Sequence, residues 1–78
     1  MDDGSGIIGV VAETVRRARK SAGWSQEDLA LEADVDRTYI SQVERGKRNV
    51  TIVVLSKIAR ALKTTPDRLL IPPRKSKG

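Results

Sequence analysis

The chain of 78 residues contains no cysteine, no histidine and no phenylalanine. Without cysteine and histidine it can form no disulfide, no Cys/His zinc site and no histidine-based catalytic centre. Aromatic residues make up only 3% of the chain, so the core must be built from Ile, Leu, Val and Ala. Such a core is thin, and we expect modest stability unless a second subunit adds buried surface.

Long apolar runs are also missing. No segment approaches the roughly 20 apolar residues that a membrane-spanning helix needs. The opening segment, MDDGSGIIGVVAETV, is acidic where a secretory signal would be basic. These features predict a cytoplasmic protein with no membrane partner.

The charge that is present is unevenly distributed. The net charge is +5, with basic residues concentrated at 16–20, 45–48 and 74–77 and acidic residues between 27 and 36. Segregated positive charge is typical of proteins that bind nucleic acid. Ordinary solvated helix faces would give the same composition, so charge alone does not separate the two interpretations.

Apolar periodicity predicts an all-α fold of five short helices, with no alternating strand pattern. The first helix is expected over about residues 7–22 and ends at Gly23, a typical left-handed cap. Its apolar stripe consists of Ile8, Val11, Val15, Ala18 and Ala22. One ordered domain is expected over residues 7–71, between a flexible N-terminus at 1–6 and a basic flexible tail at 72–78.

Capping residues place the second and third helices. Ser25 followed three residues later by Asp28 is a short version of the capping box and predicts a helix of about eight residues. A turn at Asp34 and Val35 follows, with the valine buried. Asp36 then caps a third helix that runs to about residue 45.

Two threonines mark the last two helices. Thr51 caps the fourth helix, and Thr65 caps a short fifth helix in which Leu69 and Leu70 face the core. The core stripe expected for the fourth helix is Ile52, Leu55, Ile58, Ala59 and Leu62.

One face of the third helix is polar, and it carries Arg37, Thr38, Ser41 and Gln42. Arginine can donate two hydrogen bonds to guanine, glutamine can pair with adenine, and serine or threonine can bond to several bases. A generic exposed helix is the alternative, but such a helix more typically carries Lys and Glu. The pattern therefore favours a helix that reads base edges in a DNA groove.

The segments SQEDLA, DRTYISQVERGKRN and TIVVLSKIARAL together resemble the lambda repressor-like helix-turn-helix family, also called the Xre family. The similarity covers about residues 10–70. The stretch DRTYIS followed by ERGKRN is particularly similar to controller proteins of restriction–modification systems, although related sequences occur in other repressors. The resemblance implies a five-helix domain that binds double-stranded DNA as a symmetric dimer, with the base-reading positions at Arg37, Thr38, Ser41 and Gln42.

The resemblance also assigns residues to the DNA backbone. Gln26 would anchor a phosphate and orient the first side chain of the third helix. The loop after that helix would meet the backbone through Lys47, Arg48 and Asn49. Tyr39 would have a mixed role, with its ring packed at the core boundary and its hydroxyl reaching a phosphate.

Three further residues are interpreted as structural. The resemblance implies a salt bridge between Arg19 and Glu44 that ties the first helix to the third. Trp24 is interpreted as core filling, the alternative being an indole N–H directed at a phosphate near the start of the second helix.

A dimer interface is expected on the fourth and fifth helices. In related controllers these helices form the two-fold interface, and the apolar residues at the edge of the core stripes would supply it here. Scattered exposed apolar residues, which need no partner, are the alternative. The expected interface residues are Val53, Val54, Ala61, Leu70 and Ile71.

The sequence thus predicts a sequence-specific transcriptional regulator that acts as a homodimer on an inverted repeat, with control of a restriction–modification operon as one hypothesis. The alternatives are a prophage or chromosomal repressor, or the antitoxin of a toxin–antitoxin pair. We expect no cofactor, metal or small-molecule ligand. We also expect no enzymatic activity, because no nucleophile has an adjacent base and no glycine-rich phosphate loop is present.

Overall fold

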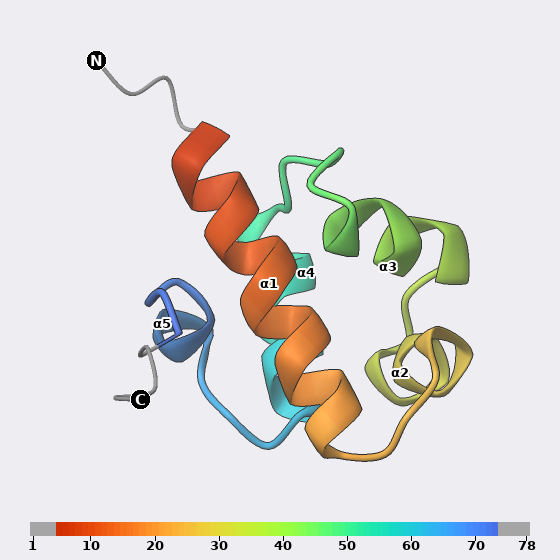
Figure 1. The fold of residues 1–78 in the computed structure, drawn as a ribbon. Coiled ribbons are helices and arrows are strands. Elements are labelled where there is room, and N and C mark those ends of the chain that lie inside the picture. The colour runs from red at the N-terminus through yellow and green to blue at the C-terminus, as the bar shows by residue number, and fades with distance from the viewer. Residues whose placement is uncertain (1–4, 74–78) are drawn as a thin grey trace.

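The computed structural model describes residues 5–73, and over that range the chain forms five helices and no strand, as Figure 1 shows. The helices are α1 (Ser5–Ser21), α2 (Gln26–Ala33), α3 (Arg37–Glu44), α4 (Ile52–Ala61) and α5 (Pro66–Leu69). The predicted all-α fold is confirmed. The first helix begins at residue 5, earlier than the predicted residue 7. Residues 1–4 and 74–78, which hold most of the predicted flexible ends, lie outside the described residues.

Side-chain caps define the starts of three helices, as predicted. At α2, the Ser25 Oγ accepts a hydrogen bond from the Asp28 N–H at 3.0 Å. The Asp28 carboxylate accepts one from the Ser25 N–H at 2.9 Å, which completes a capping box. Asp36 and Thr51 accept equivalent bonds at the starts of α3 and α4. Each cap satisfies a backbone donor that the helix itself cannot pair.

The predicted cap of α5 is different. Thr65 occupies the N-cap position, but its side chain makes no capping hydrogen bond. The polar Thr65 side chain instead favours the charged form of Asp67 and lowers the pKa of that carboxyl group. Pro66 at the first helical position, with its fixed φ, therefore contributes more to starting this short helix than the threonine does.

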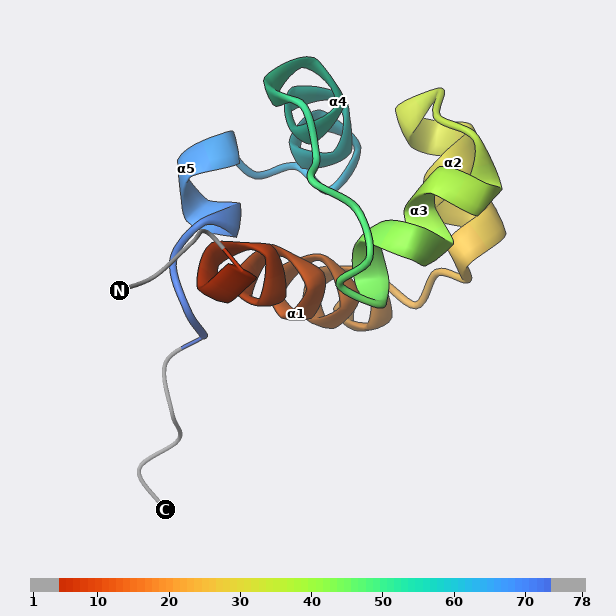
Figure 2. The same ribbon diagram turned by 90° about the horizontal axis from the view of Figure 1, so that it is seen from above.

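The core is enclosed by the five helices, with α1 on one side and α4 opposite it in Figure 2. Each of the first four helices contributes to it, and the largest fully buried side chains are Val15, Leu29, Ile40, Val43 and Ile58. Burying a side chain of this kind stabilises the fold by about 1.5–3 kcal/mol. The apolar stripes of the sequence thus supply the core almost alone.

Several residues at helix ends were wrongly predicted to lie in the core. Ile52 is 80% exposed, and Leu70 and Ala22 are exposed. Val35, predicted to be buried in the turn, is half-buried and packs against the core. Periodicity gives the direction of a side chain around its helix, but it does not show whether a neighbouring element reaches that end of the helix. Ile52 is the first residue of α4, and no other helix covers it.

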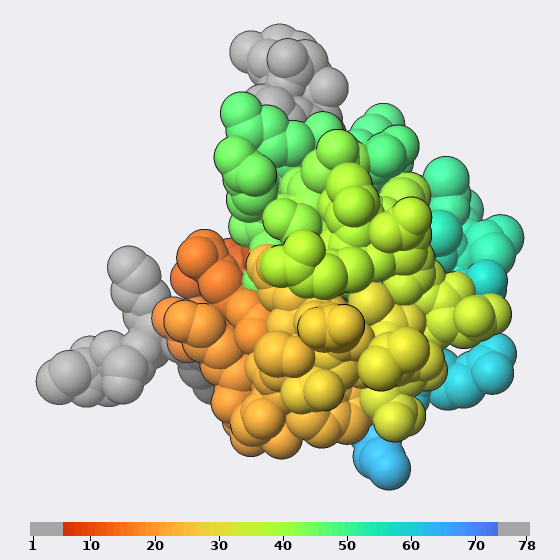
Figure 3. All heavy atoms as spheres, turned by 90° about the vertical axis from the view of Figure 1, so that its right-hand side faces the viewer, coloured from red at the N-terminus to blue at the C-terminus, as the bar shows by residue number. Residues whose placement is uncertain are grey.

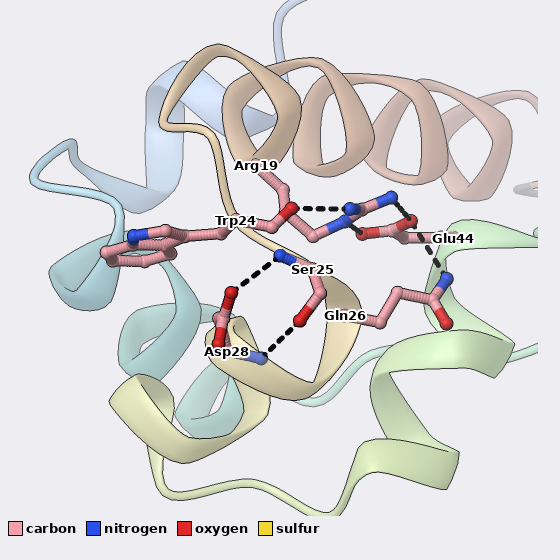
Figure 4. Close-up of polar contacts among 6 residues, drawn as sticks. All are labelled: Arg19, Trp24, Ser25, Gln26, Asp28 and Glu44. Atoms are coloured by element: carbon pink, nitrogen blue, oxygen red, sulfur yellow. Dashed lines mark hydrogen bonds and ion pairs between the residues drawn. The ribbon is translucent and has the colours of Figure 1, made fainter.

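Arg19 and Glu44 form a buried ion pair that joins α1 to α3 (Figure 4). The guanidinium Nε donates to Glu44 Oε2 at 2.7 Å, and Nη2 donates to Oε1 at 2.9 Å. Its Nη1 donates to the Trp24 carbonyl at 2.8 Å. The hydrogen bond to Glu44 raises the pKa of Arg19, so the arginine stays charged although it is buried.

Gln26 connects a third helix, α2, to the ion pair between α1 and α3. Its Nε2 donates to Glu44 Oε1 at 3.1 Å, so the carboxylate accepts bonds from both α1 and α2. Among the described residues, no buried side-chain nitrogen or oxygen lacks a hydrogen-bond partner. The cost of burying the two charges is therefore offset by complete hydrogen bonding.

We predict that Arg19→Ala lowers the free energy of unfolding by about 3–5 kcal/mol, because the Glu44 charge stays buried without its partner. Urea denaturation followed by circular dichroism measures the change. Arg17→Ala is the matched control, since Arg17 pairs with Glu13 at 3.3 Å on the exposed side of the same helix. That substitution should cost less than about 1 kcal/mol. Equal losses in the two variants would show that burial of the Arg19 pair has no special importance.

Candidate nucleic-acid interface

Helices α2 and α3 pack against each other across a short turn. Asp34 closes α2 in the left-handed region, with φ of 59°, and its N–H donates to the Ala30 and Leu31 carbonyls. The half-buried Val35 packs against the core between the two helices. Figure 3 shows α2, α3 and the loop after α3 as one continuous face of the molecule, coloured from orange to green. This is the geometry of a helix-turn-helix unit.

One face of α3 packs against the core, and the opposite face is accessible to solvent. Ile40 and Val43 are almost completely buried. On the opposite side Arg37 and Thr38 are exposed, while Ser41 and Gln42 are half-buried. A helix that enters a DNA groove needs such an accessible polar face on a fixed support. The structure thus brings the four predicted base-reading residues together on one surface.

Gln26 lies at the first position of α2 and points toward α3 (Figure 4). Its amide bonds to Glu44 at the end of that helix, and not to Arg37 at its start. The bond to Glu44 uses only the amide nitrogen of Gln26, so the orientation of Arg37 by Gln26 that the resemblance implied stays a prediction. The Arg37 side chain has only donors, so it could not accept the bond that the Gln26 NH₂ group donates to Glu44.

The loop after α3 folds back onto that helix. Gly46 has a φ of 69°, and the Lys47 N–H donates to the Gln42 carbonyl at 2.9 Å. This turn reverses the chain and returns Arg48 to the polar face of α3. Lys47, Arg48 and Asn49 are all exposed there.

Arg48 makes contacts that the sequence did not predict. Its Nε and Nη2 both donate to the Gln42 Oε1, at 3.0 and 2.7 Å. Its guanidinium carbon lies 4.4 Å from the centroid of the Tyr39 ring, a cation–π contact. The two contact partners lie six and nine positions earlier in the chain, and helix periodicity gives no signal for contacts made through a reversed loop. Gly46, a residue type that favours chain reversals, was the one feature of the sequence that indicated this turn.

Tyr39 combines packing with a polar contact. Its ring packs against the core, and its hydroxyl accepts a hydrogen bond from the Thr51 N–H at a long 3.4 Å. Because the hydroxyl acts as an acceptor in this contact, its own proton is still available for another acceptor. The arrangement is compatible with the mixed role that the sequence suggested.

Trp24 lies half-buried against the core. Figure 4 shows its indole ring directed away from Gln26 and from the start of α2. This placement agrees with core filling and gives no support to a phosphate contact at that helix terminus.

The predicted dimer residues divide into two groups. Val53 is 66% exposed, and Leu70 and Ile71 are also exposed. Val54 and Ala61 are half-buried and pack against the core. Ile52, the neighbour of Val53 in the chain, is 80% exposed as well.

The described residues contain no group of three or more Asp, Glu, His or Cys side chains that could hold a metal ion. The acidic residues between 27 and 36 are therefore dispersed or engaged as caps. Across residues 5–73, the helices are too short or too polar to cross a membrane.

Comparison with known proteins matches residues 15–69 to the helix-turn-helix family. The control protein C.BamHI of Bacillus amyloliquefaciens is 49% identical over 59 residues, which cover 74% of this chain and 73% of that protein. The crystal structure of a hypothetical transcription factor from Neisseria superposes with a TM-score of 0.84 at 40% identity, covering 94% of this chain and 84% of its own.

A second solved structure contains DNA. The restriction–modification controller protein C.Esp1396I, a tetramer in complex with its natural 35 base-pair operator, is 36% identical with a TM-score of 0.75. The match covers 81% of this chain and 83% of that one. The chain therefore belongs to the helix-turn-helix family of DNA-binding transcriptional regulators, within which it is similar to the controller proteins of restriction–modification systems.

Proposed function

We propose that this regulator binds a short inverted repeat as a homodimer and controls the genes of a restriction–modification system. The observation that carries the proposal is the accessible polar face of α3, supported from behind by Ile40 and Val43. In this proposal Arg37, Thr38, Ser41 and Gln42 contact base edges in the major groove.

Residues around α3 would contact phosphates and so set the register of the protein on DNA. Lys47, Arg48 and Asn49 are exposed beside the recognition face, which supports this role. Tyr39 retains a hydroxyl proton that it could donate, and Gln26 lies at the start of α2, where a helix terminus favours an anion.

The dimer would form through the exposed apolar surface around the start of α4 and the end of α5. Ile52, Val53, Leu70 and Ile71 are all exposed there. Val54 and Ala61 would lie at the edge of the interface. Two recognition helices about 34 Å apart would then reach half-sites one helical turn apart.

The assignment to restriction–modification control is supported by the similarity to C.BamHI and C.Esp1396I. The protein would act in the cytoplasm, where bacterial DNA lies. The neighbouring genes provide the direct check, because a methyltransferase and an endonuclease beside this gene are expected. Prophage genes in their place would favour a phage repressor.

We predict that Arg37→Ala weakens binding to the preferred operator by about 1–3 kcal/mol and relaxes the preference at one base pair. Electrophoretic mobility shifts with single-base operator variants measure both effects. A uniform loss across all sequences would contradict a base-reading role for this residue.

We predict that Lys47→Ala weakens binding to every sequence alike, because a phosphate contact carries no sequence information. The slope of log K against log salt should fall by about 1. Fluorescence anisotropy titrations at several salt concentrations measure the slope. If the slope is unchanged, Lys47 does not neutralise a phosphate.

We predict that Val53→Glu makes the protein monomeric at micromolar concentration, because a charge would be buried in the interface. Sedimentation equilibrium reports the mass directly. Leu31→Glu is the matched control, since Leu31 is 76% exposed on α2 and lies outside the proposed interface. A wild-type protein that is monomeric with and without DNA would rule out the two-fold arrangement.

A further inference from the structure

The side chain of Gln42 has its amide oxygen fully engaged within the protein. Both hydrogen bonds from Arg48, at 3.0 and 2.7 Å, end on the same Oε1 atom. An amide oxygen has two lone pairs, so these bonds use its whole acceptor capacity. A guanidinium group has only donors, which means that the amide atom facing it must be oxygen. The NH₂ group of Gln42 consequently points away from Arg48.

We propose that Arg48 sets the base preference of Gln42 by holding its oxygen, so that Gln42 selects guanine and not adenine. The inference rests on the proposed function, in which Gln42 faces base edges. Pairing with adenine requires the glutamine oxygen to accept a bond from N6 while the NH₂ group donates to N7. With the oxygen occupied, the adenine N6 donor finds no partner. Guanine presents acceptors only, N7 and O6, which suit an NH₂ group.

The other two bases suit this arrangement less well. Thymine offers a single acceptor, O4, beside its methyl group, and cytosine offers only the N4 donor. The positive charge of Arg48, next to Gln42, also favours the electronegative edge of guanine. Gln42 considered alone would suit adenine, but with its oxygen held by Arg48 it suits guanine.

Arg48 is itself held in place by contacts other than those with Gln42. Its guanidinium lies over the Tyr39 ring at 4.4 Å, and the Tyr39 hydroxyl is bonded to the backbone of Thr51 at the start of α4. The network thus connects α3, its following loop and the cap of α4. A side chain fixed on two sides loses less freedom when DNA arrives.

Arg48 can hold Gln42 and contact a phosphate at the same time. The guanidinium has five N–H donors, and only two of them bond to another residue within 5–73, both to Gln42. Binding to the DNA backbone would therefore not require release of the glutamine. Arg48 is a positioning residue for Gln42 in addition to its proposed backbone contact.

Selection from a random library of double-stranded DNA tests the proposal. The base pair read by Gln42 is identified as the one whose preference disappears in Gln42→Ala. At that position the wild type should prefer guanine over adenine by about tenfold, the size expected of one good base contact. Arg48→Ala frees the oxygen and should reverse the preference toward adenine.

Two controls separate positioning from direct reading by Arg48. Lys47→Ala removes a neighbouring charge but keeps the backbone N–H that bonds to the Gln42 carbonyl, so it should leave the guanine preference unchanged. In the Gln42→Ala background, Arg48→Ala should change no base preference and only lower the affinity. A wild-type preference for adenine, an unchanged guanine preference in Arg48→Ala, or a base preference that still depends on Arg48 in the double variant would each overturn the proposal.

The outcomes of the selection distinguish an error in this inference from an error in the proposed function. If the wild type selects no sequence motif at all, the proposed function is wrong. If it selects a motif that Arg48→Ala does not alter, only the inference is wrong. Should Arg48→Ala bind too weakly for selection, two duplexes that differ only in guanine or adenine at that position can be compared at low salt, where phosphate binding is stronger.

Discussion

The buried ion pair of Arg19 and Glu44 is the interaction on which the proposed DNA-binding surface depends. Glu44 is the last residue of α3, and its carboxylate receives bonds from Arg19 on α1 and from Gln26 on α2. The recognition helix is therefore fixed to both helices that precede it. A carboxylate close to a DNA-binding face would repel phosphate if it were free, but here it is buried and neutralised. A single buried acid thus fixes the orientation of the polar face that we propose meets DNA.

The polar face of α3 carries a second network, made of neutral and cationic groups. Arg48 lies over Tyr39 and bonds to Gln42, and Thr51 bonds to Tyr39. The first network fixes the position of α3 as a rigid element, and the second fixes one of its side chains. In the proposed function sequence preference would depend on both, because a base contact requires a helix at the correct depth and a polar group presented in one orientation.

Much of the fold could be predicted from the sequence, because caps and apolar periodicity are local signals. Ser25, Asp28, Asp36 and Thr51 marked helix starts correctly, and the main core residues followed from the stripes. The exposure of Ile52 could not be predicted, because it depends on how far a neighbouring helix extends. The contact of Arg48 with Gln42 depends on a chain reversal at Gly46 and on side-chain packing, for which spacing along the chain gives no rule.

In the proposed function, the polar face of α3 reads bases in the major groove. A crystal structure of the chain bound to its selected duplex tests it most directly. We expect α3 inserted in the major groove, with Arg37 and Gln42 within hydrogen-bond distance of base edges and Lys47 against the phosphates. A complex in which α3 lies outside the groove, or in which its polar face contacts phosphates alone, would contradict it.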